Sequence, residues 1–120
     1  MDNRATVLSL KEAVGKFRDE RDWLKFHNPK DLSIALSIES SELEELFLWK
    51  EDMTAGRVKE DRRQFSRVKE EVADIFIYLL SLSNVLGLDM SEAVAEKLAQ
   101  NAKKYPVSKS KGSNKKYDEL

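Results

Sequence analysis

The hydrophobic positions of this chain recur every three or four residues, which places them on one face of an α-helix. Four segments carry this pattern, and they predict helices over residues 9–22, 28–50, 58–86 and 89–105. No stretch shows a convincing strand pattern. The chain is therefore predicted to be all-α, with the helices joined by short loops.

Residues with strong positional preferences mark the predicted helix ends. Ser9 and Glu12 have the spacing of a capping box at the start of the first helix. Asn28 is followed by proline, which suits an N-cap before the first residue of the second helix. Gly87 can end the third helix, because glycine takes a left-handed backbone conformation without strain. Asp89 is a suitable N-cap for the last helix.

Helices of these lengths with short connections favour an antiparallel four-helix bundle. We expect residues 1–106 to form the helical domain, residues 51–57 to be a loop, and residues 107–120 to form a basic, flexible tail. The third helix is hydrophobic on almost every side between Ala73 and Leu82. Homo-oligomerisation would cover that surface, as a tetramer or as a dimer; alternatively, this helix lies at the centre of its own bundle.

The composition narrows the possible functions. The 120 residues are 41% hydrophobic and 36% charged, and they include only four glycines and two prolines. The net charge of -1 offers no general attraction to nucleic acid or to a membrane surface. The longest purely hydrophobic run, Ile75 to Leu80, is far shorter than the roughly 20 residues of a membrane span. Without cysteine there is no disulfide or thiolate site. A cytoplasmic protein is expected.

Two pairs of acidic residues interrupt hydrophobic helix faces. At 100° per residue, Glu39 lies in the middle of the hydrophobic arc of the second helix, and Glu42 joins it there. Glu71 and Asp74 occupy the corresponding positions on the third helix. Each pair is spaced i, i+3, so both side chains leave the same face of their helix. Four carboxylates are therefore expected in one bundle interior.

A buried carboxylate without a partner either raises its pKa or acquires a cation. Salt bridges would account for one such pair, and Arg67 is a candidate partner. Two pairs on separate helices favour a divalent metal ion instead, and oxygen ligands select Mg²⁺, with Mn²⁺ as a possible substitute. A di-iron site would need Glu-x-x-His on two helices, whereas the one histidine, His27, lies outside the long helices.

The acidic pairs belong to an ordered set of motifs, in which Glu39-x-x-Glu42 is followed after 28 residues by Glu71-x-x-Asp74. The accompanying sequence segments are Phe17-Arg18-Asp19-Glu20-Arg21-Asp22-Trp23, Phe26-His27, Glu45-Leu46-Phe47-Leu48-Trp49-Lys50, Asp74-Ile75-Phe76-Ile77-Tyr78-Leu79 and Lys97-Leu98-x-x-Asn101-x-x-Lys104-Tyr105-Pro106. Over about residues 8–106 this set resembles the MazG-like nucleotide pyrophosphohydrolases, in the compact branch that includes the dCTP pyrophosphatases. Ser41 stands where that family commonly has glycine before the second glutamate.

The resemblance implies hydrolysis of a nucleoside triphosphate to the monophosphate and pyrophosphate, with a pyrimidine deoxynucleotide such as dCTP preferred. Glu39, Glu42, Glu71 and Asp74 would hold Mg²⁺ at the phosphates, and Glu39 or Glu42 would act as the base for the attacking water. The alternative is a non-catalytic helical module that senses nucleotides or binds proteins. The presence of all four carboxylates argues against that alternative.

The resemblance also implies a set of residues that bind the substrate. Lys97, Asn101 and Lys104 share one face of the last helix and would contact phosphate and sugar, although a solvated basic stripe is also favourable near a helix C-terminus. Aromatic faces can stack on a nucleobase, and equally can pack in a core. The aromatic candidates are Trp23, His27, Trp49, Tyr78 and Tyr105. Trp49 shares the helical arc of Glu42, which would place a base pocket beside the metal.

Overall fold

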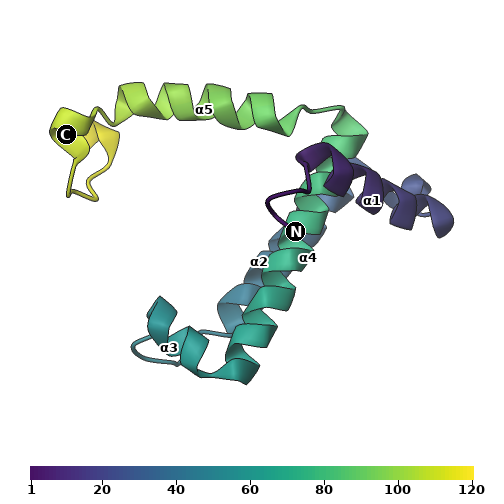
Figure 1. The fold of residues 1–120 in the computed structure, drawn as a ribbon, viewed down its shortest axis with the longest axis horizontal. Coiled ribbons are helices and arrows are strands. Elements are labelled where there is room, and N and C mark those ends of the chain that lie inside the picture. The colour runs from purple at the N-terminus through teal and green to yellow at the C-terminus, as the bar shows by residue number, and fades with distance from the viewer. The chain divides into compact units, whose positions relative to one another are not determined.

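The computed structural model describes residues 1–120, and all of its regular structure is helical (Figure 1). The all-α prediction is confirmed. The elements in chain order are α1 (Val7–Glu20), η1 (Leu24–Phe26), α2 (Pro29–Glu45), α3 (Ala55–Glu60), α4 (Arg62–Leu86), α5 (Met90–Lys104), α6 (Val107–Ser110) and η2 (Tyr117–Glu119).

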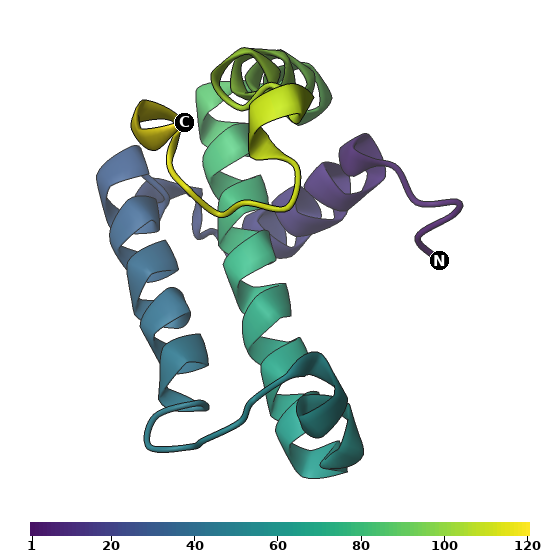
Figure 2. The same ribbon diagram turned by 90° about the vertical axis from the view of Figure 1, so that its left-hand side faces the viewer.

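The chain divides into two compact units, Met1–Gly87 and Leu88–Leu120. In the first unit α4 is the central helix, since it packs against α1, α2 and α3. Helices α2 and α4 run antiparallel and side by side (Figure 2). The amide nitrogen of Asn84 on α4 donates a hydrogen bond of 3.0 Å to the backbone oxygen of Lys11, which fastens α1 to α4.

The start of α1 differs from the prediction. Thr6 is the N-cap, and its hydroxyl accepts the backbone N–H of Ser9 at 3.0 Å. The Ser9 hydroxyl accepts the backbone N–H of Thr6 in return, at 2.9 Å. The prediction of Ser9 as the first cap is wrong, because Ser9 serves as the second partner of a capping box that begins at Thr6.

Helix α2 begins as predicted, with the Asn28 side chain accepting the backbone N–H of Asp31 at 2.9 Å. It ends at Glu45, and the predicted end near Lys50 is wrong. The side-chain amide of Gln64 on α4 donates 2.7 Å to the backbone oxygen of Leu46. After Glu45 the backbone turns more tightly, because the N–H groups of Leu46, Phe47 and Leu48 each donate to the residue three positions earlier.

The predicted third helix is two helices separated at Asp61. Thr54 caps α3 at the backbone N–H of Arg57, so the prediction of a loop over residues 51–57 and a helix beginning at Val58 is wrong. Asp61 then caps α4 by accepting the backbone N–H of Gln64 at 3.1 Å. Short polar side chains favour such capping positions over a helix interior. The predicted end at Gly87 is confirmed, with φ of 64°.

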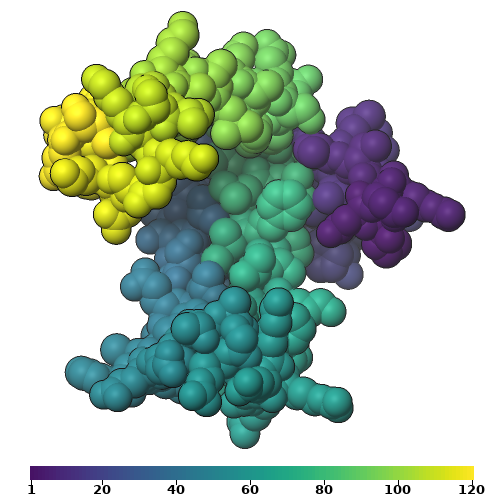
Figure 3. Space-filling view, turned by 60° about the vertical axis from the view of Figure 1, so that its left-hand side comes forward, coloured from purple at the N-terminus to yellow at the C-terminus, as the bar shows by residue number.

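The second unit contains α5, whose predicted cap is confirmed by a hydrogen bond of 2.9 Å from the backbone N–H of Glu92 to Asp89. Beyond Pro106 come two short helical segments, α6 and η2, drawn in yellow-green and yellow in Figure 1. The atoms of this C-terminal part lie beside the end of α5 (Figure 3). Tyr117 there makes an edge contact with Tyr105, with ring centroids 6.3 Å apart. The domain boundary at residue 106 and the flexibility of residues 107–120 remain predictions.

The buried hydrophobic core is small and consists of Leu32, Leu46 and Leu80. Larger hydrophobic side chains are exposed on α2 and α4, and some of them lie in the hydrophobic stretch between Ala73 and Leu82. The exposed ones on these two helices are Ile34, Ile38, Phe65, Val72, Phe76, Ile77, Leu79 and Leu86. This chain alone therefore leaves much hydrophobic surface in contact with solvent.

No single helix is long and hydrophobic enough to cross a membrane, and only α4 and α5 counted together as a bent pair meet that length and composition.

We expect Gln64→Ala to lower the free energy of unfolding by about 1–3 kcal/mol, because the buried backbone oxygen of Leu46 loses its donor. Urea denaturation at a fixed protein concentration measures this change. Gln100→Ala, on an exposed face of α5, is the matched control and should change the free energy by less than about 0.5 kcal/mol. Equal effects of the two substitutions would contradict the structural role of Gln64.

Candidate functional site

Three carboxylates from two helices meet in the first unit. One side-chain oxygen from each of Glu39, Glu42 and Glu71 lies within 4.8 Å of the others, and we call these three residues the acidic cluster. Glu39 and Glu42 lie one turn apart on α2, and the antiparallel packing of α4 brings Glu71 opposite them. Three of the four predicted ligands therefore come together.

Asp74, the fourth predicted ligand, lies outside the acidic cluster. Its side chain is exposed, one turn after Glu71 on α4. It nevertheless lines the same cavity as Glu39, and its negative charge contributes to the raised pKa of Glu39. Asp74 therefore lies at the edge of the site, and its role as a ligand remains a prediction.

No basic side chain neutralises these carboxylates. The ion pairs of the chain involve other acidic residues, and Arg67 forms none of them. The alternative in which Arg67 pairs with the acidic residues is therefore wrong. One oxygen of Glu39 and one of Glu71 are buried without any hydrogen-bond partner. Unpartnered buried carboxylate oxygens are unusual, and they fit a site that holds a cation.

The carboxyl groups of the acidic cluster repel one another and are partly removed from water, and a bound cation would relieve both effects. Burial raises the pKa of Glu39 to about 7, with further contributions from the carboxyl groups of Glu42 and Glu71 and from the charge of Asp74. A proton on Glu39 relieves repulsion between these groups, and a divalent cation would do the same more effectively. The donor set is all oxygen, which suits a hard divalent cation.

Beside the acidic cluster lies a cavity of about 240 Å³ between α1 and α4. It contains three of the predicted substrate residues, Trp23, His27 and Tyr78, and it reaches Glu39 and Asp74. We call it the aromatic cavity. Its lining residues are Val14, Phe17, Arg18, Trp23, His27, Glu39, Asp74, Ile77, Tyr78 and Ser81.

The aromatic side chains of this cavity contact one another. The rings of Phe17 and Trp23 meet edge to face with centroids 5.9 Å apart, and the Trp23 and His27 centroids are 6.5 Å apart. The Nδ1 atom of His27 is buried without a hydrogen-bond partner. Burial lowers the pKa of His27, and the positive charge of Arg18 lowers it further, which favours a neutral ring able to donate or accept a hydrogen bond.

Two polar residues of the aromatic cavity, Arg18 and Ser81, were not predicted. The Arg18 side chain is only 16% exposed and bonds to Asp19 through Nε at 2.9 Å. Ser81 is buried on α4. Arg18 lies inside the sequence segment that ends at Trp23, so the sequence could have indicated its place in the cavity. Ser81 lies in a hydrophobic stretch of α4, and nothing in the sequence around it indicates a functional role.

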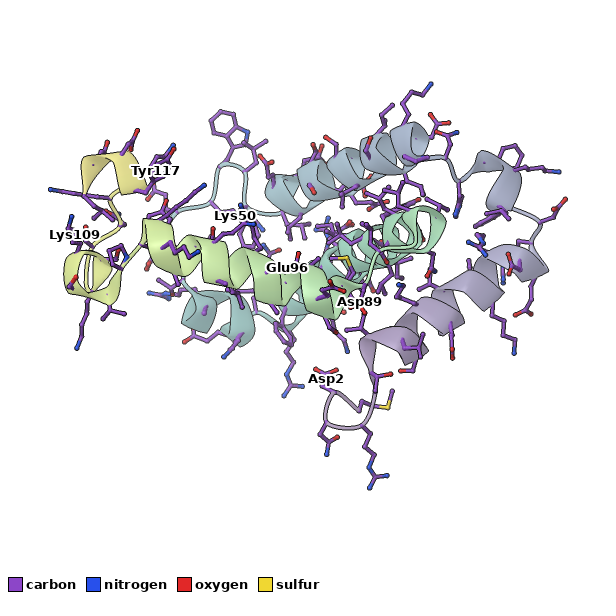
Figure 4. All side chains as sticks on the ribbon, turned by 90° about the horizontal axis from the view of Figure 1, so that it is seen from above. Asp2, Lys50, Asp89, Glu96, Lys109 and Tyr117 are labelled. Carbon is purple, nitrogen blue, oxygen red and sulfur yellow. The ribbon has the colours of Figure 1, made fainter.

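On its other side the acidic cluster opens into a cleft of about 440 Å³, which we call the charged cleft. Its lining residues are Glu42, Glu45, Leu46, Lys50, Arg67 and Glu71. Lys50, labelled in Figure 4, follows the C-terminal end of α2, and its ammonium group donates 3.3 Å to the side-chain oxygen of Gln64. Lys50 and Arg67 were not predicted to contact the substrate.

The remaining predicted substrate residues are Trp49 and four residues of the second unit. Trp49 follows α2 with φ of 63°, is 92% exposed, and lines neither the aromatic cavity nor the charged cleft. The prediction that it continues the helix on the same arc as Glu42 is wrong, although a role in substrate binding remains a prediction. The other four belong to the second unit, and their roles also remain predictions: Lys97, Asn101, Lys104 and Tyr105.

Comparison with known proteins agrees with the motifs. Residues 34–120 match the model of the MazG-like family. The chain is 39% identical to dCTP pyrophosphatase 1 of Bos taurus over 115 residues, which span 96% of this chain and 68% of that protein. For dCTP pyrophosphatase 1 of Homo sapiens the identity is 36% over the same shares.

Among solved structures, a pyrophosphatase from Archaeoglobus fulgidus is similar in fold, with a TM-score of 0.71 and 41% identity. The likeness covers 79% of this chain and 87% of that one. The resemblance predicted from the ordered motifs is thus confirmed by both sequence and fold.

We expect a divalent cation to stabilise the fold, and more at pH 8 than at pH 6. The folded pKa of Glu39 is raised to about 7 from 4.5, so the metal-free fold loses stability as the pH rises between these values. Below about pH 7 the cation must also displace a proton from Glu39. Thermal melts with MgCl₂ or MnCl₂ against EDTA measure the effect, which at 100 times Kd amounts to about 2.7 kcal/mol.

Glu71→Gln should abolish most of this stabilisation, because it removes a charged member of the acidic cluster. Glu44→Gln, on the exposed side of α2, is the matched control and should retain it. A wild-type protein whose melting temperature does not respond to either metal at pH 8 would contradict the metal site.

Proposed function

The chain belongs to the MazG-like family, and we propose that it is a Mg²⁺-dependent pyrophosphohydrolase that converts dCTP to dCMP and pyrophosphate. The observation that carries this proposal is the acidic cluster, whose buried oxygens have no basic partner, next to a cavity of aromatic residues. The similarity to dCTP pyrophosphatases over 96% of the chain supports the same substrate.

In the proposed reaction, a water molecule attacks the α-phosphorus and the bond to the bridging oxygen of the β-phosphate breaks. Pyrophosphate leaves with the electron pair of that bond, and a carboxylate takes the proton of the water. Glu39, Glu42 and Glu71 would hold the cation, with Asp74 at the edge of the site. Bound Mg²⁺ would neutralise the charge on the phosphate oxygens.

Glu39 and Glu42 remain the two candidates for the base, and they face different compartments. Glu39 lines the aromatic cavity, whereas Glu42 lines the charged cleft. A base must reach the water on the side opposite the leaving pyrophosphate, because the displacement is in line. If pyrophosphate leaves through the charged cleft, Glu39 would be the base; if it leaves through the aromatic cavity, Glu42 would be the base.

The aromatic cavity would take the nucleobase. Its volume of about 240 Å³ lies below the roughly 300–1,000 Å³ typical of pockets for drug-sized ligands, so it suits the base alone and favours a single ring. Trp23 and Tyr78 supply aromatic rings on which a base can stack, and stacking by itself tolerates any base. The unpartnered Nδ1 of His27 and the hydroxyl of Ser81, which lines the same cavity, would add hydrogen bonds that discriminate between bases.

We expect wild-type protein with Mg²⁺ to release pyrophosphate from dCTP faster than from the other deoxynucleoside triphosphates. Glu71→Gln should lower kcat at least about 100-fold, since a metal centre contributes several kcal/mol to the barrier. A panel assay of pyrophosphate release measures both, with Glu44→Gln as the control that keeps wild-type rates.

Equal and negligible rates for wild type and Glu71→Gln would refute the enzyme. Tight binding of a nucleotide without turnover would then favour the non-catalytic sensing module.

The proposed active form is a homo-oligomer in the cytoplasm, with a tetramer preferred over a dimer. The small buried core and the exposed hydrophobic side chains of α2 and α4 support this assembly, because a second copy would cover them. Phe76 and Leu79 lie within the hydrophobic stretch of α4 and are exposed in the single chain.

Light scattering after gel filtration should give a particle four times the mass of the chain. Phe76→Glu should shift it to a smaller species, because a charge would have to be buried in the interface. Lys69→Glu, also exposed on α4, is the control that should leave the mass unchanged. A wild-type monomer at micromolar concentration would exclude the assembly.

A further inference from the structure

We propose that the charged cleft is the subsite for the β- and γ-phosphates, and that Lys50 and Arg67 bind the pyrophosphate that leaves. The substrate would then lie along α2 and α4 with its base in the aromatic cavity and its terminal phosphates in the cleft. This inference rests on the proposed function and adds to it a direction of binding and two phosphate-binding residues.

The position of the acidic cluster sets this direction. Glu39 lines the aromatic cavity, while Glu42 and Glu71 line the charged cleft, so the cluster lies between the two compartments. An α-phosphate at the cluster separates the base from the β- and γ-phosphates of the same nucleotide. With the base among aromatic side chains, the terminal phosphates extend into the charged cleft. Its basic residues Lys50 and Arg67 have no acidic partner, whereas Arg18 of the aromatic cavity is paired with Asp19.

The two basic side chains of the cleft are available to an anionic ligand. Arg67 makes no hydrogen bond and no ion pair, and the ammonium group of Lys50 contacts a neutral amide rather than a carboxylate. A guanidinium group can donate two parallel hydrogen bonds to phosphate oxygens, whereas an ammonium group acts as a point charge. The pair is thus suited to two adjacent phosphates.

The cleft also contains Glu42, Glu45 and Glu71, which would repel pyrophosphate in the absence of a cation. A divalent cation at the acidic cluster would offset two of these three charges, and Lys50 and Arg67 would then dominate the cleft. Pyrophosphate binding is therefore expected to require the divalent cation.

Gln64 positions Lys50. Its side chain is 4% exposed, and its amide nitrogen is held by the backbone oxygen of Leu46 at 2.7 Å. This bond directs the amide oxygen to the ammonium group of Lys50, at 3.3 Å. Lys50 is thereby held over the C-terminal end of α2, within reach of the cleft, before any ligand arrives.

Calorimetric titration with pyrophosphate and, separately, with dCMP tests the subsite in the presence of MgCl₂. Arg67→Gln should weaken pyrophosphate binding about 10- to 100-fold, the loss expected for charged hydrogen bonds, and should change dCMP binding less than about 2-fold. Lys69→Gln, an exposed lysine of α4 that does not line the cleft, is the matched control and should affect neither ligand. Arg67→Lys should recover part of the affinity, because the charge remains.

Unchanged pyrophosphate binding in Arg67→Gln would overturn the subsite, and so would an equal loss of pyrophosphate and dCMP. A Mg²⁺-induced rise in melting temperature for Arg67→Gln equal to that of wild type establishes that the acidic cluster is intact. Failure of wild type to hydrolyse dCTP would refute the proposed function alone, because the pyrophosphate comparison does not depend on turnover.

Discussion

The packing of α2 against α4 is the interaction on which the candidate site depends. Two members of the acidic cluster lie on α2 and one lies on α4, so the cluster exists only because the antiparallel pair places Glu71 opposite Glu39 and Glu42. The same packing costs electrostatic free energy, since it raises the pKa of Glu39. A fold that maintains such repulsion without a basic partner is partly organised for a ligand rather than for its own stability.

The helices themselves could be predicted from sequence, because hydrophobic spacing and capping residues are local signals. The prediction fails at the end of α2, where the backbone changes to tighter turns after Glu45 and the oxygen of Leu46 accepts a hydrogen bond from Gln64 of α4. Nothing within residues 28–50 reports that contact. At Asp61 the deciding signal is local, because this capping residue divides the single predicted helix into α3 and α4.

The acidic cluster could also be predicted, since Glu39 occupies a hydrophobic arc where an unpaired charge is conspicuous. The residues around it could not. Ser81 and Arg67 are ordinary in the sequence, and they acquire possible roles only because α1, α2 and α4 meet and leave space between them. Trp49 shows the opposite error, because the helical arc that placed it beside Glu42 ends before it.

The two tryptophans of this chain lie in very different surroundings, and this makes them optical reporters of separate events. Trp23 forms part of the wall of the aromatic cavity, in contact with Phe17 and His27, whereas Trp49 projects into solvent. A base that stacks in the cavity would quench the emission of Trp23 alone. Covering of the surface around Trp49 would instead shift the emission of that residue to shorter wavelength, so the fluorescence of the unlabelled protein distinguishes ligand entry from association of chains.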